Sequence, residues 1–175
     1  MAINEERQLG RAKNAVLSFL EQRLSIPKIY IDAEWAGTHV DVLAINRDGV
    51  GDVHAVLLFA LRLPSDDGTI VEYLTQAIEP LIERFHEIPA QYKYIAAVDV
   101  SAQGDIVLPG IPHPITDKSF SPDGVGRIGF LSINFPAGRE PQVQVVFKPE
   151  RFRAAIAKLA NEYVQHHEAD WEIRA

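Results

Sequence analysis

The chain has 175 residues, of which 47% are hydrophobic and 23% are charged, and it contains no cysteine. This composition is typical of a globular protein and excludes a disordered or fibrous chain. The lack of cysteine excludes disulfides, thiolate metal sites and thiol catalysis. The net charge is −7, and residues 28–110 hold thirteen acidic and five basic side chains. Nucleic-acid-binding domains usually cluster lysine and arginine, so this balance weighs against nucleic acid as a partner.

The N-terminal residues Met1–Glu6 show no basic-then-apolar signal pattern, and no apolar run approaches the length of a membrane span. We therefore expect a cytoplasmic protein without a membrane partner. The length predicts a single domain over residues 1–175.

The first predicted element is a helix over about residues 4–24. Asn4 is its expected N-cap, and Pro27 lies just past its end. Apolar residues recur along it at steps of three and four, which gives one apolar stripe: Leu9, Ala12, Val16, Phe19 and Leu20.

Three predicted strands follow, over residues 28–35, 40–45 and 53–63. Gly37-Thr38 predicts the first turn, and Arg47-Asp48-Gly49 predicts a second turn of the kind that joins antiparallel neighbours. The third strand is one long apolar run, which indicates burial on both faces.

A second predicted helix begins near Thr69, where Thr69–Glu72 is a capping-box pattern. Pro80 lies inside this helix and predicts a kink or two abutting helices. Residues 94–100 predict a fourth strand. Because strand, helix and strand form a crossover unit, the third and fourth strands are expected to be parallel.

Residues 101–124 are rich in proline and glycine and predict a long loop, of the kind that is often functional. Two more strands are expected over residues 126–134 and 142–148, and a last helix from about Pro149 to Gln165. The predicted order is α-β-β-β-α-β-β-β-α. The predicted fold class is α/β, with a central mixed sheet flanked by helices and residues 149–175 as a C-terminal helix packed on the domain.

Two stretches carry a resemblance to a known family. Residues 36–49 read AGTHVDVLAINRDG, and residues 91–98 read QYKYIAAV directly after the second helix. With the element order, they resemble the restriction-endonuclease-like fold of the PD-(D/E)XK nuclease superfamily. The resemblance implies that Asp41 is the catalytic aspartate and that Glu34 is an acidic residue of the first strand. In such nucleases two carboxylates hold Mg²⁺, and a lysine two residues after the second shares its strand face.

The second half of that motif is absent. Aligning residues 53–59 with the family's V-H-V-V-E-V-K places Leu57 at the glutamate and Phe59 at the lysine. Neither side chain ligates a cation or donates a proton. The comparison therefore implies a catalytically degenerate member, in which apolar packing replaces the metal pocket.

Asp41 is the candidate metal ligand, and the alternative is a partly buried carboxylate hydrogen-bonded at a strand edge. Asp52 and His54 alternate onto one face of the third strand and would extend a relocated site. A turn-flanking aspartate and a solvent-facing histidine are the alternative interpretation. Glu34 is equally consistent with an exposed strand carboxylate.

The remaining polar candidates are weaker. Glu79 and Glu83 are expected on the solvated face of the second helix. His113, in the long loop, is either a ligand contact or part of a segment that wraps the sheet edge. His166 and His167 are adjacent and not spaced for one helical face, so no metal site is expected there.

We expect a non-catalytic restriction-endonuclease-like protein that acts as a binding or scaffolding module, either self-associating or bound to a protein partner. One alternative is a Mg²⁺-dependent nuclease with a relocated site around Asp41, Glu34 and Asp52. Another is a small-molecule-binding α/β domain with residues 101–124 as a lid. No cofactor is expected unless the chain is catalytic, in which case the cofactor is Mg²⁺.

Overall fold

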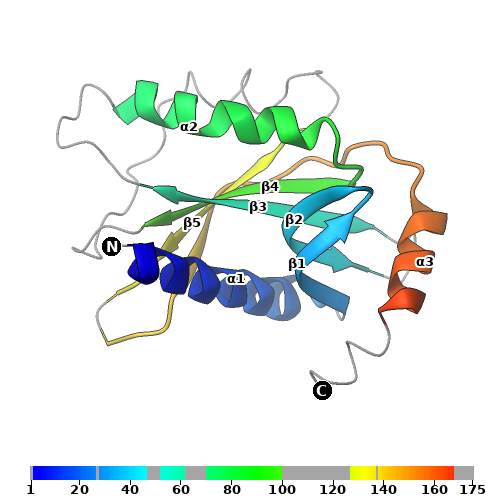
Figure 1. Ribbon diagram of the computed structural model, residues 1–175, viewed down its shortest axis with the longest axis horizontal. Coiled ribbons are helices and arrows are strands. Elements are labelled where there is room, and N and C mark those ends of the chain that lie inside the picture. Colours follow the sequence, from blue (N-terminus) through cyan, green and yellow to red (C-terminus); the bar gives the residue numbers. More distant parts are fainter. Residues whose placement is uncertain are drawn as a thin grey trace.

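The protein is built around one mixed β-sheet (Figure 1). The computed structural model describes residues 2–26, 28–46, 52–61, 70–99, 127–136 and 138–167. The α/β class with a mixed sheet and helices on its faces, which the sequence predicts, is confirmed. The elements in this part of the chain are α1 (Ala2–Leu24), β1 (Lys28–Trp35), β2 (Thr38–Ile45), β3 (Val53–Leu61), α2 (Ile70–Phe85), β4 (Tyr92–Asp99), β5 (Gly129–Asn134), β6 (Gln142–Phe147) and α3 (Ala157–His166).

The six strands lie in the sheet in the order of the sequence, from β1 to β6. β1, β2 and β3 form an antiparallel meander. β3, β4 and β5 are parallel, and β6 returns antiparallel to β5. The predicted parallel pairing across the α2 crossover is therefore confirmed.

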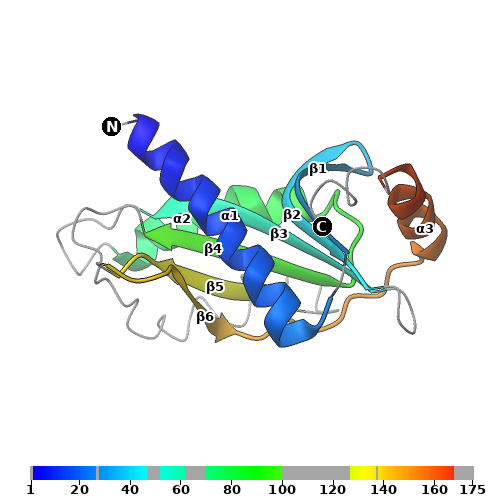
Figure 2. The same cartoon turned by 90° about the horizontal axis from the view of Figure 1, so that it is seen from below.

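α1 and α2 cover opposite faces of the sheet, here named the α1 face and the α2 face (Figure 1). Ala12, Val16 and Leu20 of the predicted stripe are fully buried on the α1 face. Seen from below, α1 runs obliquely across the strands (Figure 2). On the α2 face, apolar residues of α2 share one buried cluster with Ala160 and Val164 of α3, which lies beside the β1–β2 hairpin.

The β1–β2 hairpin changes faces half-way along its length. The paired residues Ile29 and Ala44 are buried on the α1 face, whereas Ala33 and Val40, paired nearer the tip, are buried on the α2 face. Strict alternation would keep residues four apart on one face. The change occurs around Asp32, whose φ is +53°. This left-handed conformation is one that aspartate adopts more readily than most residues, and it turns the tip of the hairpin toward the α2 face.

The tip of the hairpin is anchored to the end of α2. Its two-residue turn, Ala36-Gly37, has positive φ at both positions, as the turn that matches the strand twist requires. The fully buried Trp35 donates from Nε1 to the carbonyl of Pro89 at 2.7 Å. Arg84 donates from Nη2 to the backbone carbonyl of His39 at 2.9 Å. Both strands are therefore held in place close to the turn.

Several predicted boundaries are corrected. α1 begins at Ala2, so Asn4 lies inside the helix, and the predicted N-cap is wrong because nothing before it breaks the helix. Thr38 begins β2 and does not belong to the turn. Pro80 lies within α2, which is one helix, so the alternative of two abutting helices is wrong.

The C-terminal helix is shorter than the sequence predicts, because residues 149–156 are not helical. The backbone N–H of Phe152 donates to the carbonyl of Gln91 at 2.7 Å, and Nε2 of Gln91 donates to the carbonyl of Ala154 at 3.0 Å. These bonds engage backbone groups that a helix would need for its own ladder. Pro149 therefore does not lie in the first turn of α3.

Some predictions fall outside the described residues: the 101–124 loop with His113, the turn at residues 47–49, Thr69 and the side chain of Glu72 in the capping box, and residues 168–175. Among the helices that are described, none combines the length and the apolar character needed to cross a membrane.

Candidate metal centre

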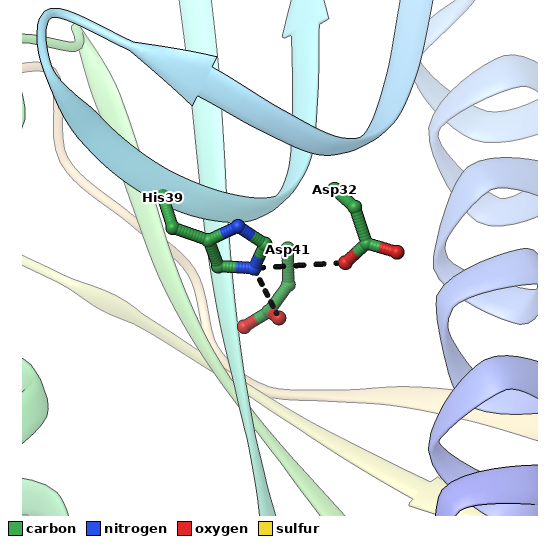
Figure 3. Close-up of side chains that lie close together, drawn as sticks. All are labelled: Asp32, His39 and Asp41. Carbon is green, nitrogen blue, oxygen red and sulfur yellow. Dashed lines mark hydrogen bonds and ion pairs between the residues drawn. The ribbon is translucent and has the colours of Figure 1, made fainter.

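Three side chains with metal-ligand atoms converge at the β1–β2 hairpin (Figure 3). Asp32 comes from β1, and His39 and Asp41 come from β2. Nε2 of His39 lies 3.4 Å from Oδ1 of Asp41 and 3.6 Å from Oδ1 of Asp32. One ligand atom from each residue lies within 4.8 Å of the others. The three atoms are close enough to bind one cation together.

The register of the hairpin explains why these residues meet. Ile31 pairs with Val42 and Ala33 pairs with Val40, so Asp32 and Asp41 lie opposite each other between these two pairs. His39 precedes Asp41 by two residues, and the 3.4 Å contact between Nε2 and Oδ1 shows that both side chains lie on one side of the strand. Like charges directly opposite each other destabilise a strand pair unless a cation compensates them.

Lys13 of α1 supplies a cationic group at this point. Its Nζ atom lies 2.6 Å from Oδ1 of Asp32 and 3.6 Å from Oδ1 of Asp41. The side chain of Lys13 is 20% exposed and that of Asp41 is 15% exposed, whereas Asp32 is 52% exposed. The group is therefore closed toward Asp41 and open to solvent on the side of Asp32.

Asp41 also has a structural bond. Its Oδ2 atom accepts a hydrogen bond of 2.8 Å from the backbone N–H of Leu58 on β3. This is the strand-edge role expected of Asp41 as the alternative to metal binding. The two roles use different oxygens, because Oδ1 is the atom near His39 and Lys13.

Leu57 and Phe59 lie on the other face of the sheet from Lys13. Leu57 is fully buried in the cluster beneath α2, and Phe59 packs against the same cluster. The two apolar side chains therefore do not fill the space around Asp41. The side chains at the two positions aligned with the family's glutamate and lysine are thus not part of the group around Asp41.

The other acidic candidates do not belong to this group. Glu34 is exposed on β1 and contributes no ligand atom to it. Asp52 lies at the opposite end of the β2–β3 pair, where its carbonyl accepts from the N–H of Asn46 at 2.9 Å. That end is about 16 Å of strand away from Asp41, and Asp52 pairs there with Arg151 at 3.0 Å. The predicted relocated site around Asp41, Glu34 and Asp52 is therefore not assembled.

Other polar candidates have structural surroundings. His54 is only 7% exposed, so the expectation of a solvent-facing histidine is wrong. Its ring stacks on that of Tyr92 on β4. Glu79 and Glu83 are exposed on α2, as predicted. The ring of His167 stacks on Tyr163 at 4.0 Å between centroids.

Asp32, His39 and Lys13 were not found by sequence reasoning. A signal existed for the first two, because His39 and Asp41 are two residues apart and a hairpin folded at Gly37 brings residue 32 opposite residue 41. No local pattern identifies Lys13, whose place depends on how α1 packs across the sheet.

Comparisons with family models, with curated proteins and with solved structures find no match for this chain. The resemblance to PD-(D/E)XK nucleases therefore stays a prediction. The function of this protein has to be inferred from its own side chains.

Proposed function

We propose that this protein binds one divalent cation between Asp32, His39 and Asp41 and hydrolyses a phosphodiester there. The observation that carries the proposal is the convergence of two carboxylate oxygens and one imidazole nitrogen within 4.8 Å. Two opposed carboxylates on a tight hairpin repel each other, and a bound cation turns this repulsion into attraction.

The donor set fits a divalent cation. Carboxylate oxygens suit Mg²⁺ and Mn²⁺, whereas an imidazole ligand suits transition metals better than Mg²⁺. His39 therefore shifts the expected ion from Mg²⁺, which the family resemblance implies, toward Mn²⁺. A cation of this kind supplies a Lewis acid for a phosphoryl oxygen and lowers the pKa of bound water.

Lys13 is the anion-binding group in this proposal. Its ammonium lies 2.6 Å from Asp32 and 3.6 Å from Asp41, so it competes with a metal ion for the same oxygens. The buried stripe of α1 fixes the backbone of Lys13 beside the hairpin. Once the carboxylates bind the metal, Lys13 is free to meet a phosphate oxygen as a point charge.

The charge of the chain favours a small phosphodiester over a long nucleic acid. The net charge is −7, and the acidic excess lies in residues 28–110, which contain the three ligands. A polyanion meets repulsion from such a surface, whereas a small substrate needs only the local charge of the cation and Lys13.

Manganese binding tests the first half of the proposal. Calorimetry of the full chain with Mn²⁺ is expected to give one site, and Asp32→Asn is expected to weaken it at least about tenfold. Lys13→Met is expected to strengthen binding, because the competing ammonium is removed. Glu34→Gln, an exposed carboxylate on the same strand, is the matched control. No binding at millimolar Mn²⁺, or equal losses in Asp32→Asn and Glu34→Gln, rejects the site.

Turnover tests the second half. In the presence of Mn²⁺ the protein is expected to release nitrophenolate from bis(4-nitrophenyl) phosphate. Lys13→Met is expected to lose most of this activity although it binds Mn²⁺ more tightly. Binding of Mn²⁺ with no hydrolysis in the unmodified chain rejects the reaction and leaves a cation-binding protein.

A second candidate is the non-catalytic binding or scaffolding module that the sequence predicts. The observation that favours it is the 2.6 Å ion pair, because Lys13 already neutralises Asp32 and fastens α1 to the hairpin. If that is its whole role, Lys13→Met lowers the free energy of unfolding and Mn²⁺ gives no binding heat in either form. The same variant thus separates the two candidates.

A further inference from the structure

A second site lies near the C-terminal end of α1, away from the candidate metal centre. A pocket of about 530 Å³ is lined there by residues of α1, by the first residues of β3 and β4, and by the end of β6. Its lining residue Arg23 follows Lys13 by ten residues, about 15 Å along the axis of α1. The volume lies in the range of small-molecule sites in proteins.

The floor of the pocket is aromatic. His54 and Tyr92 are paired across β3 and β4, and their rings stack with centroids 4.6 Å apart and planes 18° apart. The ring of Tyr94 lies 6.1 Å from that of His54, and its hydroxyl is 3.5 Å from Nδ1. Burial lowers the pKa of His54 to about 4, so its imidazole is uncharged at neutral pH. His54 and Tyr94 are 7% and 4% exposed, and one face of the His54 ring is covered by Tyr92, so the half-buried Tyr92 is the ring of this floor that a ligand can reach best.

The rim of the pocket is apolar and exposed. Leu24 is 38% exposed and Val145 is 37% exposed, and both line this pocket. Among the described residues, Leu24 and Val145 are the large hydrophobic side chains that are exposed to solvent. Apolar surface gathered at the mouth of one pocket is typical of a ligand site.

The charged groups of the pocket are mainly cationic. Arg23 and Lys148 both line it, and neither has a carboxylate partner among the described residues. Asp52 also lines it, but its charge is compensated by Arg151 at 3.0 Å. In a protein with a net charge of −7, two cations beside an aromatic floor favour an anionic ligand.

We propose that this pocket binds a small planar aromatic anion, such as a ring that carries a carboxylate, sulfonate or phosphate. The ring lies against Tyr92, next to the edge of His54, and the anionic group meets Arg23 and Lys148. Arginine suits this role because its guanidinium donates to two anionic oxygens at once. The site shares no residue with the metal centre and does not depend on the function proposed there.

Nuclear magnetic resonance of the full chain tests the proposal with two matched probes, 2-naphthoate and its neutral analogue 2-naphthamide. Saturable shifts of the His54, Tyr92 and Lys148 amide signals are expected with naphthoate, and at least about tenfold weaker binding with naphthamide. Arg23→Gln is expected to weaken naphthoate about tenfold and to leave naphthamide unchanged. Arg7→Gln, which removes an exposed arginine from the other half of α1, is the control and is expected to change neither.

The proposal is overturned by any of three results. The first is no saturable shift at these amides with millimolar naphthoate. The second is equal affinity for the two probes, since the cations then have no role. The third is equal effects of Arg23→Gln and Arg7→Gln on naphthoate binding. Both arginines are exposed, so thermal melts of the two variants are expected to match that of the unmodified chain.

Discussion

Oδ2 of Asp41 accepts a hydrogen bond of 2.8 Å from the backbone N–H of Leu58. The ladder between β2 and β3 ends at the pair Val42 and Val56, and β3 continues beside β4 alone. Beyond this pair, the carboxylate of Asp41 accepts the backbone hydrogen bond of β3 that a further residue of β2 would otherwise accept. The same bond fixes the orientation of the side chain, so that Oδ1 stays near His39 and Lys13.

Substitutions of Asp41 separate these two roles. Asp41→Asn keeps an acceptor for Leu58, whereas Asp41→Ala leaves that half-buried N–H without a partner. We expect Asp41→Ala to lower the free energy of unfolding by about 1–3 kcal/mol more than Asp41→Asn. Both variants lose the ion pair with Lys13, so the difference isolates the hydrogen bond. Urea unfolding measures it, and equal losses in the two variants contradict the role assigned to Oδ2.

Restoring the nuclease motif at Leu57 is not expected to restore a metal site. Leu57 is fully buried beneath α2, so Leu57→Glu places a carboxylate in an apolar cluster without a partner. We expect a loss of more than about 3 kcal/mol in urea unfolding. Leu57→Met, which conserves volume, is the control and is expected to cost less than about 1.5 kcal/mol. A folded Leu57→Glu/Phe59→Lys variant that binds Mn²⁺ more tightly than the unmodified chain would show that these residues reach Asp41.

The buried histidine predicts a pH dependence of stability. Burial lowers the pKa of His54 from 6.5 to about 4, so the unfolded chain binds this proton more readily than the folded one. The contribution of His54 to stability is therefore complete above pH 6.5 and is lost as the pH falls toward 4. The loss is on the order of 3 kcal/mol.

His54→Phe tests this, because phenylalanine still stacks on Tyr92 but does not titrate. We expect the free energy of unfolding of this variant to fall less steeply with decreasing pH across that window, measured by urea unfolding at a series of pH values. His166→Gln, at an exposed histidine, is expected to follow the unmodified chain. Identical pH dependence in His54→Phe and the unmodified chain contradicts the buried neutral state.

The candidate metal centre was only partly predictable. Asp41 was predictable from the strand motif. Its partners were not, since Glu34 and Asp52 were expected beside it. Asp52 is excluded by distance along the strand. Asp32, opposite Asp41, supplies the second carboxylate, whereas Glu34 pairs with His39 but contributes no ligand atom. Counting outward from the turn at Gly37 identifies Asp32, whereas Lys13 requires the packing of α1 across the sheet.

Elements with a repeated residue pattern were predictable from the amino-acid sequence. The stripe of α1, the long apolar run of β3 and the parallel pairing of β3 with β4 all follow from backbone periods of 3.6 and two residues and from the α2 crossover. These patterns are local, and each is supported by many residues at once.

Which groups meet depends on contacts between distant parts of the chain. The left-handed φ of Asp32 turns the hairpin tip to the α2 face, the bonds of Gln91 keep residues 149–156 from forming a helix, and Leu57 is buried on the face away from Lys13. Each of these outcomes depends on one residue and its distant partners, with no repeated pattern to reveal it. A strand's period fixes which residues share a face only where the strand is regular, whereas long-range packing fixes what that face contacts.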